Sequence, residues 1–367
     1  MARDAFASAG GTADGICVIM AGGRGTRFWP LSRRDRPKQL LPLGAGVSLL
    51  RDTYERLAPL VGDERILVVT SGNLTDDVCA QLPELPRRNV ITEPAGRNTA
   101  PCAVLGVGLA GRLDPQAPVA LLPADHAIDA AAVFGRQLAE AFALARADRT
   151  VVTLGITPTR PETGYGYLET EAPAGDGGVR AGTAFVEKPD RARAETYLRS
   201  GRHFWNAGIF VWHPGYFADM ARRHIPAVVQ LMAAPIAAFG TDGFTAALAE
   251  AYDDCPADSI DFAVMEKLPD FQVLPAAFGW SDLGSWDAWG DLAPRLTGDN
   301  RGLAELLALD STGNVVSASG KTVALIGVDE LIVVDTPDAL LVCRKDDAQR
   351  IKEIITRLEE RQRSDLL

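Results

Sequence analysis

The sequence predicts an α/β fold in which a Rossmann-like, mostly parallel sheet is followed by a small β-rich module and a terminal helix. Short β-branched runs alternate with longer segments rich in alanine and leucine. A glycine-rich turn follows the first of these runs directly, and evenly spaced strand-like runs dominate near the C-terminus. We expect a flexible segment at 1–14, one large domain at 15–289 and a C-terminal module at 290–367.

The large domain begins with alternating strands and helices. The predicted strands cover residues 16–20, 66–70, 90–92, 119–122 and 151–154, and the predicted helices between them cover 48–59, 99–113 and 131–147. Because this order favours a parallel sheet, ligands are expected at the carboxyl ends of the strands. From residue 164 onward, strands at 166–170, 183–186 and 208–212 and helices at 191–199 and 215–223 extend the same domain.

The C-terminal module has a different pattern. Short runs at 314–317, 322–326 and 331–334, separated by glycine and aspartate, are typical of one or two coils of a β-solenoid. Ile351, Ile354, Ile355 and Leu358 then recur at helical spacing and predict an amphipathic final helix. That apolar stripe requires a surface to pack on, so we expect the module to contribute packing or a subunit contact.

Composition disfavours several functional classes. The 37 basic and 48 acidic residues leave a formal charge of −11, which disfavours nucleic acid or an anionic membrane as the main partner. No apolar run approaches the ~18 residues of a membrane span, and the start of the chain lacks the features of a signal peptide. Five cysteines without CxxC spacing indicate reduced thiols and a cytoplasmic location. A polyanionic ligand would therefore need a local basic cluster.

The glycine-rich turn is Ala21-Gly22-Gly23-Arg24-Gly25-Thr26-Arg27. Its glycines allow positive φ and let backbone amides approach a phosphate closely. It is not a Walker A loop, because no Gly-Lys-Ser/Thr follows, and its glycine spacing differs from the dinucleotide fingerprint. The continuation to Pro42 completes the local basic cluster, which consists of Arg24, Arg27, Arg33, Arg34, Arg36 and Lys38. The alternative interpretation is a solvated basic loop after a buried strand.

Two aspartates are candidate metal ligands. Asp125 follows the apolar run that ends at Pro123, at the expected ligand-binding edge of the sheet, and Asp282 lies in Gly279-Trp280-Ser281-Asp282. Carboxylates there suit magnesium, which takes one or two protein oxygens together with waters and substrate phosphates. The alternatives are a turn or helix cap at Asp125, and at Asp282 an N-cap of the helix entered at Ser285.

The stretch from Met20 to Pro42 resembles the signature of the sugar-phosphate nucleotidylyltransferases. Its segments Phe28-Trp29-Pro30-Leu31-Ser32 and Pro37-Lys38-Gln39 are similar to the mannose-1-phosphate guanylyltransferase branch, and the similarity continues to about Trp289. The resemblance implies that 15–289 is a nucleotidyltransferase domain with a sugar-binding extension. It also implies that Mg²⁺ is bound by Asp125 and Asp282, and that Arg24 and Lys38 stabilise charge on the phosphates and the departing pyrophosphate.

The resemblance also implies the binding residues. The triphosphate would lie on the glycine loop, at Ala21, Gly22, Gly23, Gly25 and Thr26. The sugar phosphate would be bound by Gly164, Tyr165, Glu187, Lys188 and Asn206, although Glu187 and Lys188 are also compatible with a solvated ion pair. The segment Thr92–Pro101 closes a strand and opens a helix, so Glu93, Asn98 and Thr99 are candidates on the nucleotide side, with an N-cap as the alternative for Asn98.

We therefore expect transfer of GMP from GTP to mannose 1-phosphate, which gives GDP-mannose and pyrophosphate. A phosphate monoester is largely dianionic near pH 7, so such a reaction needs alignment and positive charge rather than a general base. The alternatives are another sugar 1-phosphate, such as that of glucose or a heptose, another nucleotide, or a non-catalytic nucleotide-sugar sensor. The family resemblance implies a homodimer. About eighty residues follow Trp286, which predicts a chain without a fused phosphomannose isomerase domain.

Overall fold

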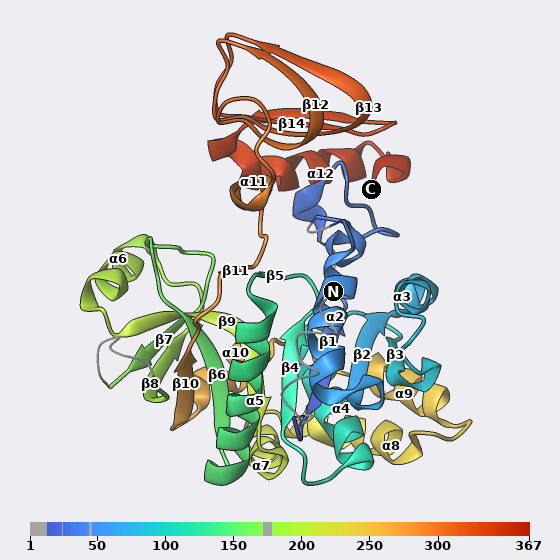
Figure 1. Ribbon diagram of the computed structural model, residues 1–367. Helices are drawn as coiled ribbons and strands as arrows, with labels where there is room; N and C mark the ends of the chain where they lie inside the picture. The colour runs from blue at the N-terminus through green and yellow to red at the C-terminus, as the bar shows by residue number, and fades with distance from the viewer. Residues whose placement is uncertain (1–12, 24, 44–45, 172–177) are drawn as a thin grey trace. The chain divides into compact units, whose positions relative to one another are not determined.

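The computed structural model describes residues 13–23, 25–43, 46–171 and 178–367, and the chain divides into two compact units (Figure 1). Unit 1 comprises Met1–Gly22, Tyr54–Ala124 and Ile128–Trp280, and unit 2 comprises Gly23–Thr53, Asp125–Ala127 and Ser281–Leu367. Both units are therefore assembled from segments that are far apart in the sequence. The domain boundaries proposed from the sequence, 14/15 and 289/290, remain predictions.

Among the described residues, unit 1 contains a nine-stranded sheet in the order β3-β2-β1-β4-β9-β6-β10-β8-β7. Its strands are β1 (Ile16–Ala21), β2 (Ile66–Ser71), β3 (Val90–Glu93), β4 (Val119–Pro123), β6 (Val151–Ile156), β7 (Tyr167–Thr170), β8 (Arg180–Val186), β9 (His203–Trp212) and β10 (Phe271–Pro275). The first four strands pair in parallel, whereas β9 runs antiparallel to both β4 and β6. The predicted parallel core is thus present, and the antiparallel strands come from the extension after residue 164.

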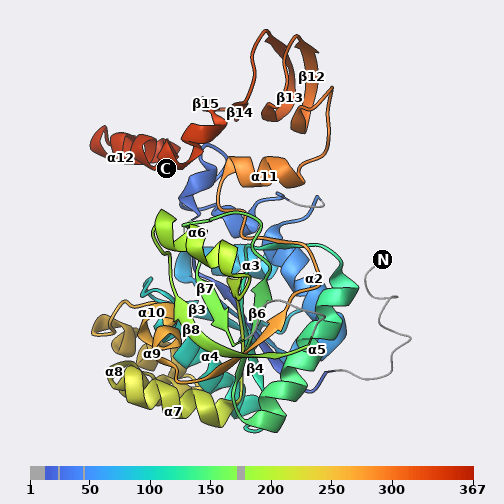
Figure 2. The ribbon, with the colours of Figure 1, turned by 90° about the vertical axis from the view of Figure 1, so that its left-hand side faces the viewer.

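Helices cover both faces of this sheet. They are α3 (Thr75–Gln81), α4 (Thr99–Leu113), α5 (Ala131–Asp148), α6 (Arg191–Ser200), α7 (Pro214–His224), α8 (Pro226–Ala238), α9 (Phe244–Asp253) and α10 (Ile260–Ala263). α4 packs with α7 and α8, whereas α5 packs against β6 and β9. Figure 2 shows α5 and the α7–α8 pair on opposite sides of the sheet. This is the two-sided covering that parallel strands require.

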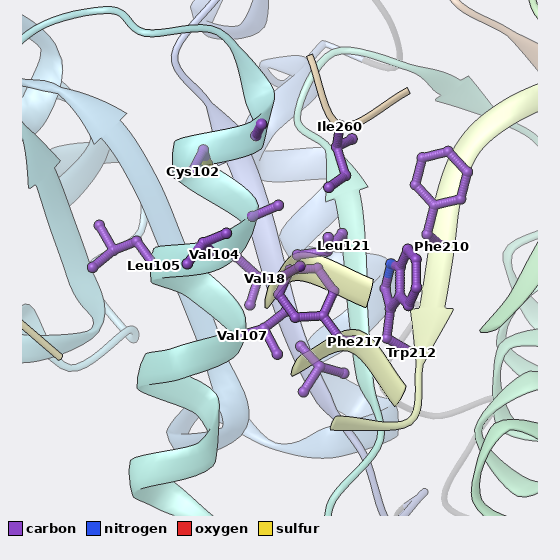
Figure 3. Close-up of a cluster of buried hydrophobic side chains, with 14 of the residues drawn as sticks. Val18, Cys102, Val104, Leu105, Val107, Leu121, Phe210, Trp212, Phe217 and Ile260 are labelled. Atoms are coloured by element: carbon purple, nitrogen blue, oxygen red, sulfur yellow. The ribbon is translucent and has the colours of Figure 1, made fainter. Parts of the chain in front are cut away.

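The core of unit 1 lies between α4 and the central strands. Figure 3 shows Val104 and Val107 of α4 beside Val18 of β1, with Phe210 and Trp212 of β9 completing the cluster. These side chains are at most 5% exposed. Full burial of an aliphatic or aromatic side chain of this size contributes about 1.5 to 3 kcal/mol, so the cluster holds the carboxyl ends of β1 and β4 in fixed register.

Unit 2 contains the chain after β1 and the C-terminal module. Among the described residues, its four-stranded sheet has the order β12-β13-β14-β15, formed by β12 (Arg301–Leu309), β13 (Val315–Ile326), β14 (Leu331–Asp335) and β15 (Leu340–Arg344). The first three strands pair in parallel, as in coils of a solenoid. Its described helices are α11 (Trp286–Leu292), α12 (Ile351–Glu360) and the short 3₁₀ helices η1 (Thr26–Phe28), η2 (Lys38–Leu40), η7 (Lys345–Arg350) and η8 (Ser364–Leu366).

A separate apolar cluster joins these parts of unit 2. It includes Phe28, Trp29, Trp286, Trp289 and Ile351, all buried. The indole nitrogens of Trp286 and Trp289 donate to the main-chain oxygens of Trp29 and Leu43 at 3.1 and 2.8 Å. Of the predicted stripe, Ile351, Ile355 and Leu358 therefore pack on the residues that follow the glycine loop, whereas Ile354 is exposed.

The remaining elements are short or include residues of both units. They are α2 (Leu49–Val61), β5 (Ala127–Ile128) and β11 (Trp280–Ser281), together with η3 (Asp63–Arg65), η4 (Gly72–Leu74), η5 (Arg87–Asn89) and η6 (Met265–Lys267). No helix in the described part of the chain has the length and hydropathy to cross a membrane. All five cysteines are free thiols.

Candidate functional site

The glycine loop lies close to Lys38 at residue Gly25. Gly25 has a φ of 55°, in the left-handed region, and its hydrogen atoms face Lys38. A Cβ atom at Gly25 would lie 2.4 Å from the Cβ and 2.6 Å from the amide nitrogen of Lys38, which are impossible contacts. The Gln39 side chain donates to the Gly23 oxygen at 2.9 Å and fixes the same approach. A glycine is therefore required at residue 25.

The other loop residues lie at the end of β1 and the start of η1. Ala21 is the buried last residue of β1, Gly22 and Gly23 are exposed, and exposed Thr26 begins η1. Arg24, predicted to act on the phosphates, lies outside the described residues.

Lys38 connects the two predicted metal aspartates. Its side chain is only 7% exposed, and its ammonium forms an ion pair with Asp125 Oδ2 at 2.8 Å. The same nitrogen donates to the main-chain oxygen of Asp282 at 2.5 Å. Three segments meet at this point: η2, the residues after β4, and the residues after β11. The sequence-predicted residues Lys38, Asp125 and Asp282 are thus brought together within unit 2.

These residues line a cavity of about 370 Å³, together with Gly25, Thr26, Arg27, Phe28, His126, Leu283, Gly284 and Lys352. The Asp125 side chain is 35% exposed. Burial acts to raise the pKa of this carboxyl, but the Lys38 ammonium, His126 and the hydrogen bonds to the carboxylate together outweigh burial, and the pKa lies below its usual value. Asp125 is therefore an anion at neutral pH.

Neither aspartate is a helix cap. Strand β5 follows Asp125, and Ser285 caps α11 by accepting a hydrogen bond from the Ala288 amide at 3.3 Å. One oxygen of Asp282 accepts from the Gly284 amide at 3.0 Å, an interaction that orients the side chain. The two caps weighed as alternatives for these positions are thus not observed.

The side chains that line this cavity can be compared with the ligands that divalent metal ions prefer. Among the described residues, no group of three or more histidine, cysteine and acidic side chains is placed to hold a metal ion, which disfavours a structural zinc site. Two hard carboxylates with an open cavity beside them match magnesium, which keeps waters and phosphates in its coordination shell. The Lys38 ammonium already pairs with the Asp125 carboxylate and donates to the main-chain oxygen of Asp282. The residues present therefore fit Mg²⁺.

Glu93, which the sequence suggested as a residue that binds the nucleotide, is a buried carboxyl at the end of β3 in unit 1. It is 5% exposed, and its Oε1 accepts a hydrogen bond from the Tyr252 hydroxyl at 2.5 Å. Its other oxygen would lie 3.1 Å from a Cβ atom at Gly22, so it faces the start of the glycine loop. Burial raises the pKa of Glu93 to about 7, although the Tyr252 hydrogen bond acts in the opposite direction.

Asn98 and Thr99 begin α4. Asn98 has a φ of 64° and its side chain accepts from the Thr99 amide at 2.9 Å, so the N-cap weighed as an alternative is present. The Thr99 hydroxyl accepts a hydrogen bond from the Ile260 amide at 3.0 Å. Nearby, Arg97 donates to the Tyr252 and Asp253 main-chain oxygens. The loop from Glu93 to Thr99 is therefore held by the C-terminal end of α9 and the start of α10.

The predicted sugar-phosphate residues also lie together in unit 1. The Lys188 amide donates to the Tyr165 oxygen at 3.2 Å, and the Lys188 ammonium pairs with Glu187 Oε1 at 2.7 Å. Glu187 is 11% exposed whereas Lys188 is 55% exposed, so the pair presents its cation to solvent. Gly164 donates to Glu162 at 3.0 Å.

Asn206 lies on β9 and donates to Asp261 Oδ1 at 3.2 Å. Burial, together with the nearby Glu187 carboxylate, raises the pKa of Asp261 to about 6. Asp261 was not expected from the sequence. A lone aspartate two residues after the N-cap Ser259 carries no local signal, and its relation to Asn206 and Glu187 depends on the sheet.

Two further residues were also missed. Tyr252 is separated from its partner Glu93 by 159 residues, and Lys352 is an ordinary basic residue on an amphipathic helix. Neither lies in a motif, so each could be found only from its neighbours in space.

Comparison with known proteins gives the class. A model of the nucleotidyl transferase family matches residues 16–298, and a model of the mannose-phosphate isomerase/GMP-like β-helix domain matches residues 304–358. The chain therefore belongs to the nucleotidyl transferase family, with a C-terminal β-helix domain of that type.

Individual proteins and a solved structure are similar to this chain over most of its length. The chain is 37% identical over 364 residues to mannose-1-phosphate guanylyltransferase 2 of Escherichia coli O157:H7, covering 96% of this chain and 75% of that protein. It is 36% identical over 355 residues to the xanthan biosynthesis protein XanB of Xanthomonas campestris, with the same coverage. A solved structure from Thermus thermophilus, described as a mannose-1-phosphate geranyltransferase, aligns with a TM-score of 0.83 and 38% identity over 94% of this chain and 99% of that one.

Proposed function

We propose that this chain transfers GMP from GTP to mannose 1-phosphate, releasing GDP-mannose and pyrophosphate. Membership of the nucleotidyl transferase family and the names of its relatives support the reaction class and the sugar. The observation that carries the proposal is the meeting of Lys38, Asp125 and Asp282 in one cavity beside the glycine loop.

The chemistry is an in-line substitution at the α-phosphorus of GTP. An oxygen of the mannose 1-phosphate forms the new bond to this phosphorus while the bond from it to the β-phosphate oxygen breaks, and the electron pair leaves with pyrophosphate. The nucleophile is largely dianionic near pH 7, since its second pKa is about 6, so no proton must be removed by the protein. The protein must supply alignment and positive charge.

In this proposal the glycine loop acts on the triphosphate together with Lys38, Asp125 and Asp282. The amides from Ala21 to Thr26 bind its oxygens, and Arg24 and Lys38 stabilise charge on the phosphates and on the leaving pyrophosphate. Asp125 and Asp282 would hold a magnesium ion, which would supply positive charge beside the phosphates. Because Lys38 is bound to both aspartates, it is already fixed in place before substrate arrives.

On the base side, Glu93 is proposed to read guanine. Guanine presents two donors, N1–H and N2–H, on the same edge, and one carboxylate can accept both, whereas adenine presents an acceptor at N1. Supporting this role, Glu93 has one oxygen taken by Tyr252 and the other directed to the start of the glycine loop. Asn98 and Thr99 are proposed to shape the same loop, because both are engaged in hydrogen bonds at the start of α4.

The sugar phosphate is proposed to bind on the surface formed by Gly164, Tyr165, Glu187, Lys188 and Asn206. The exposed Lys188 ammonium suits a phosphate, and the buried Glu187 carboxylate suits sugar hydroxyls. Asp261, which accepts from Asn206, orients that amide. A homodimer and a cytoplasmic location are further expectations from the sequence.

The test is an assay of pyrophosphate release from GTP and mannose 1-phosphate with Mg²⁺. Parallel reactions replace GTP by ATP or UTP, and mannose 1-phosphate by glucose 1-phosphate or a heptose 1-phosphate. We expect the GTP and mannose 1-phosphate pair to give the highest kcat/KM. A higher kcat/KM for another pair would reassign the substrates, and binding of GDP-mannose without turnover of any pair would identify a sensor instead.

A further inference from the structure

The C-terminal end of the chain is bound to the residues that follow the glycine loop. The Trp29 indole nitrogen donates to the Leu366 oxygen at 2.8 Å, and the Arg34 amide donates to the Leu367 oxygen at 3.1 Å. The Arg34 guanidinium pairs with Glu359 of α12 at 3.0 Å. All these residues lie in unit 2. The end of the chain is thus part of the structure around the proposed phosphate site.

The first turn of α12 is anchored most firmly. Ile351 is 3% exposed and belongs to the cluster that includes Phe28 and Trp29. Phe28 is the last residue of η1 and lines the cavity of Lys38. Because Ile351 is fixed against these residues, the backbone of the next residue, Lys352, is fixed as well.

Lys352 lines the same cavity as Lys38, Asp125 and Asp282. Of the described charged residues around it, three are cationic, namely Arg27, Lys38 and Lys352, and two are acidic. Lys352 therefore provides the excess positive charge among these residues.

The neighbouring basic residues on this part of the chain form ion pairs with acidic side chains, whereas Lys352 does not pair with any described carboxylate. Lys345 pairs with Glu330 at 3.2 Å, and Arg350 pairs with Asp347 and Glu353 at 3.2 and 3.0 Å. For Lys352, no carboxylate of the described residues lies within 4.0 Å. An ammonium that lines a cavity without a protein counter-ion is a site for an anion from solution.

We propose that Lys352 binds the β- and γ-phosphates of the nucleoside triphosphate and the pyrophosphate that leaves, so that α12 is part of the phosphate site. This proposal rests on the function proposed above. The β,γ-phosphates are favoured over the sugar phosphate because the residues that share the cavity with Lys352 include Gly25, Thr26 and Arg27 of the glycine loop. A lysine suits this task because its flexible stem carries a point charge to a phosphate.

The test compares Lys352→Met with wild type in both reaction directions. Methionine keeps the length of the apolar stem and a similar helix propensity, so the variant removes the charge with little change to α12. We expect KM to rise about tenfold to a hundredfold for GTP and for pyrophosphate, the effect of losing one hydrogen bond to a charged group, and to change less than about twofold for mannose 1-phosphate. Calorimetric titration with GTP in the absence of mannose 1-phosphate should show the same loss of affinity without any turnover.

Two further variants control for the helix itself. Arg357→Gln removes an exposed charge from the same helix without touching the cavity, and it should leave both KM values unchanged. Lys352→Arg restores the charge and should recover most of the affinity. If Lys352→Met does not fold, as judged by urea unfolding, Lys352→Gln is measured in its place.

The outcomes separate this inference from the proposed function. If wild type does not use GTP and mannose 1-phosphate, the proposed function fails. If wild type does so but Lys352→Met or Lys352→Gln binds GTP and pyrophosphate as tightly as wild type, the role of Lys352 is refuted. An equal loss in Arg357→Gln would also refute it, because the effect would then be one of general charge or of helix stability.

Discussion

The buried Glu93 carboxyl should cost the protein stability at neutral and alkaline pH. Burial raises the pKa of Glu93 from its usual 4.5 to about 7. In the folded protein the carboxyl therefore keeps its proton up to about pH 7, whereas in the unfolded chain it loses the proton near pH 4.5. Between these values unfolding releases a proton, so the contribution of Glu93 to the free energy of unfolding falls as pH rises.

The magnitude follows from the two pKa values. At about 1.4 kcal/mol for each pH unit, the interval from 4.5 to about 7 gives a penalty of about 3 kcal/mol above pH 7. Glu93→Gln removes this penalty, since an amide does not ionise, and it keeps an oxygen that can accept from the Tyr252 hydroxyl. The variant should therefore be equal to wild type near pH 4.5 and about 3 kcal/mol more stable near pH 8.

The measurement is urea unfolding of both proteins at intervals from about pH 4.5 to about pH 8.5, with the difference in unfolding free energy plotted against pH. Glu250→Gln, at an exposed position of α9, is the matched control, and its difference from wild type should stay constant. A difference for Glu93→Gln that does not change with pH would refute the buried-acid argument. If Glu93 reads guanine, the stabilised variant should also bind GTP more weakly, because a neutral amide accepts a hydrogen bond less strongly than a carboxylate.

Four more substitutions test the site. Asp125→Asn and Asp282→Asn should each reduce Mg²⁺-dependent turnover to background with an unchanged circular dichroism spectrum; wild-type turnover in either variant would rule out the metal assignment. Lys188→Met should raise the KM for mannose 1-phosphate at least about tenfold with little change for GTP, and a change confined to GTP would show that Lys188 is wrongly placed. Gly25→Ala should lower the free energy of unfolding by about 1 to 2 kcal/mol and reduce kcat, because its Cβ would overlap Lys38; a fully active, equally stable variant would contradict the close approach.

Local patterns predicted the elements of the large domain well. The segment predicted as a helix at 99–113 is α4, and the first three predicted strands differ from β1, β2 and β3 by a single residue at one end. These elements carry a clear periodicity, strong turn residues at their ends, or both. By contrast, α8 is apolar on most sides and contains Pro235, so neither its length nor its period was evident from the sequence.

The β-module was predicted less completely. Two expected runs, 314–317 and 322–326, belong to the single strand β13, which has a register shift opposite Leu303 and Glu305 of β12. β12 and β15 were not predicted as strands. Each exposes apolar side chains on one face, including Leu307, Leu309 and Leu340, and an edge strand with weak alternation resembles a loop in sequence.

In the candidate site, too, some features were predictable from the sequence and others depend on the tertiary structure. The sequence by itself determined which residue types were available: a glycine loop after a buried strand, a lysine a short way beyond it, and aspartates that follow strand-like runs. Such features depend on neighbours a few residues apart, and so they can be recognised locally.

Only the tertiary structure decided which of these residues meet. Lys38 lies 87 residues from Asp125 and 244 from Asp282, and Glu93 lies 159 from Tyr252. These distances along the chain are closed by the packing of buried side chains in each unit, not by any local preference. For the same reason the position of Lys352 beside the glycine loop depends on Ile351 in the core of unit 2. A charged residue on an amphipathic helix lies beside a specific site only when the apolar face of that helix packs on the rest of the protein.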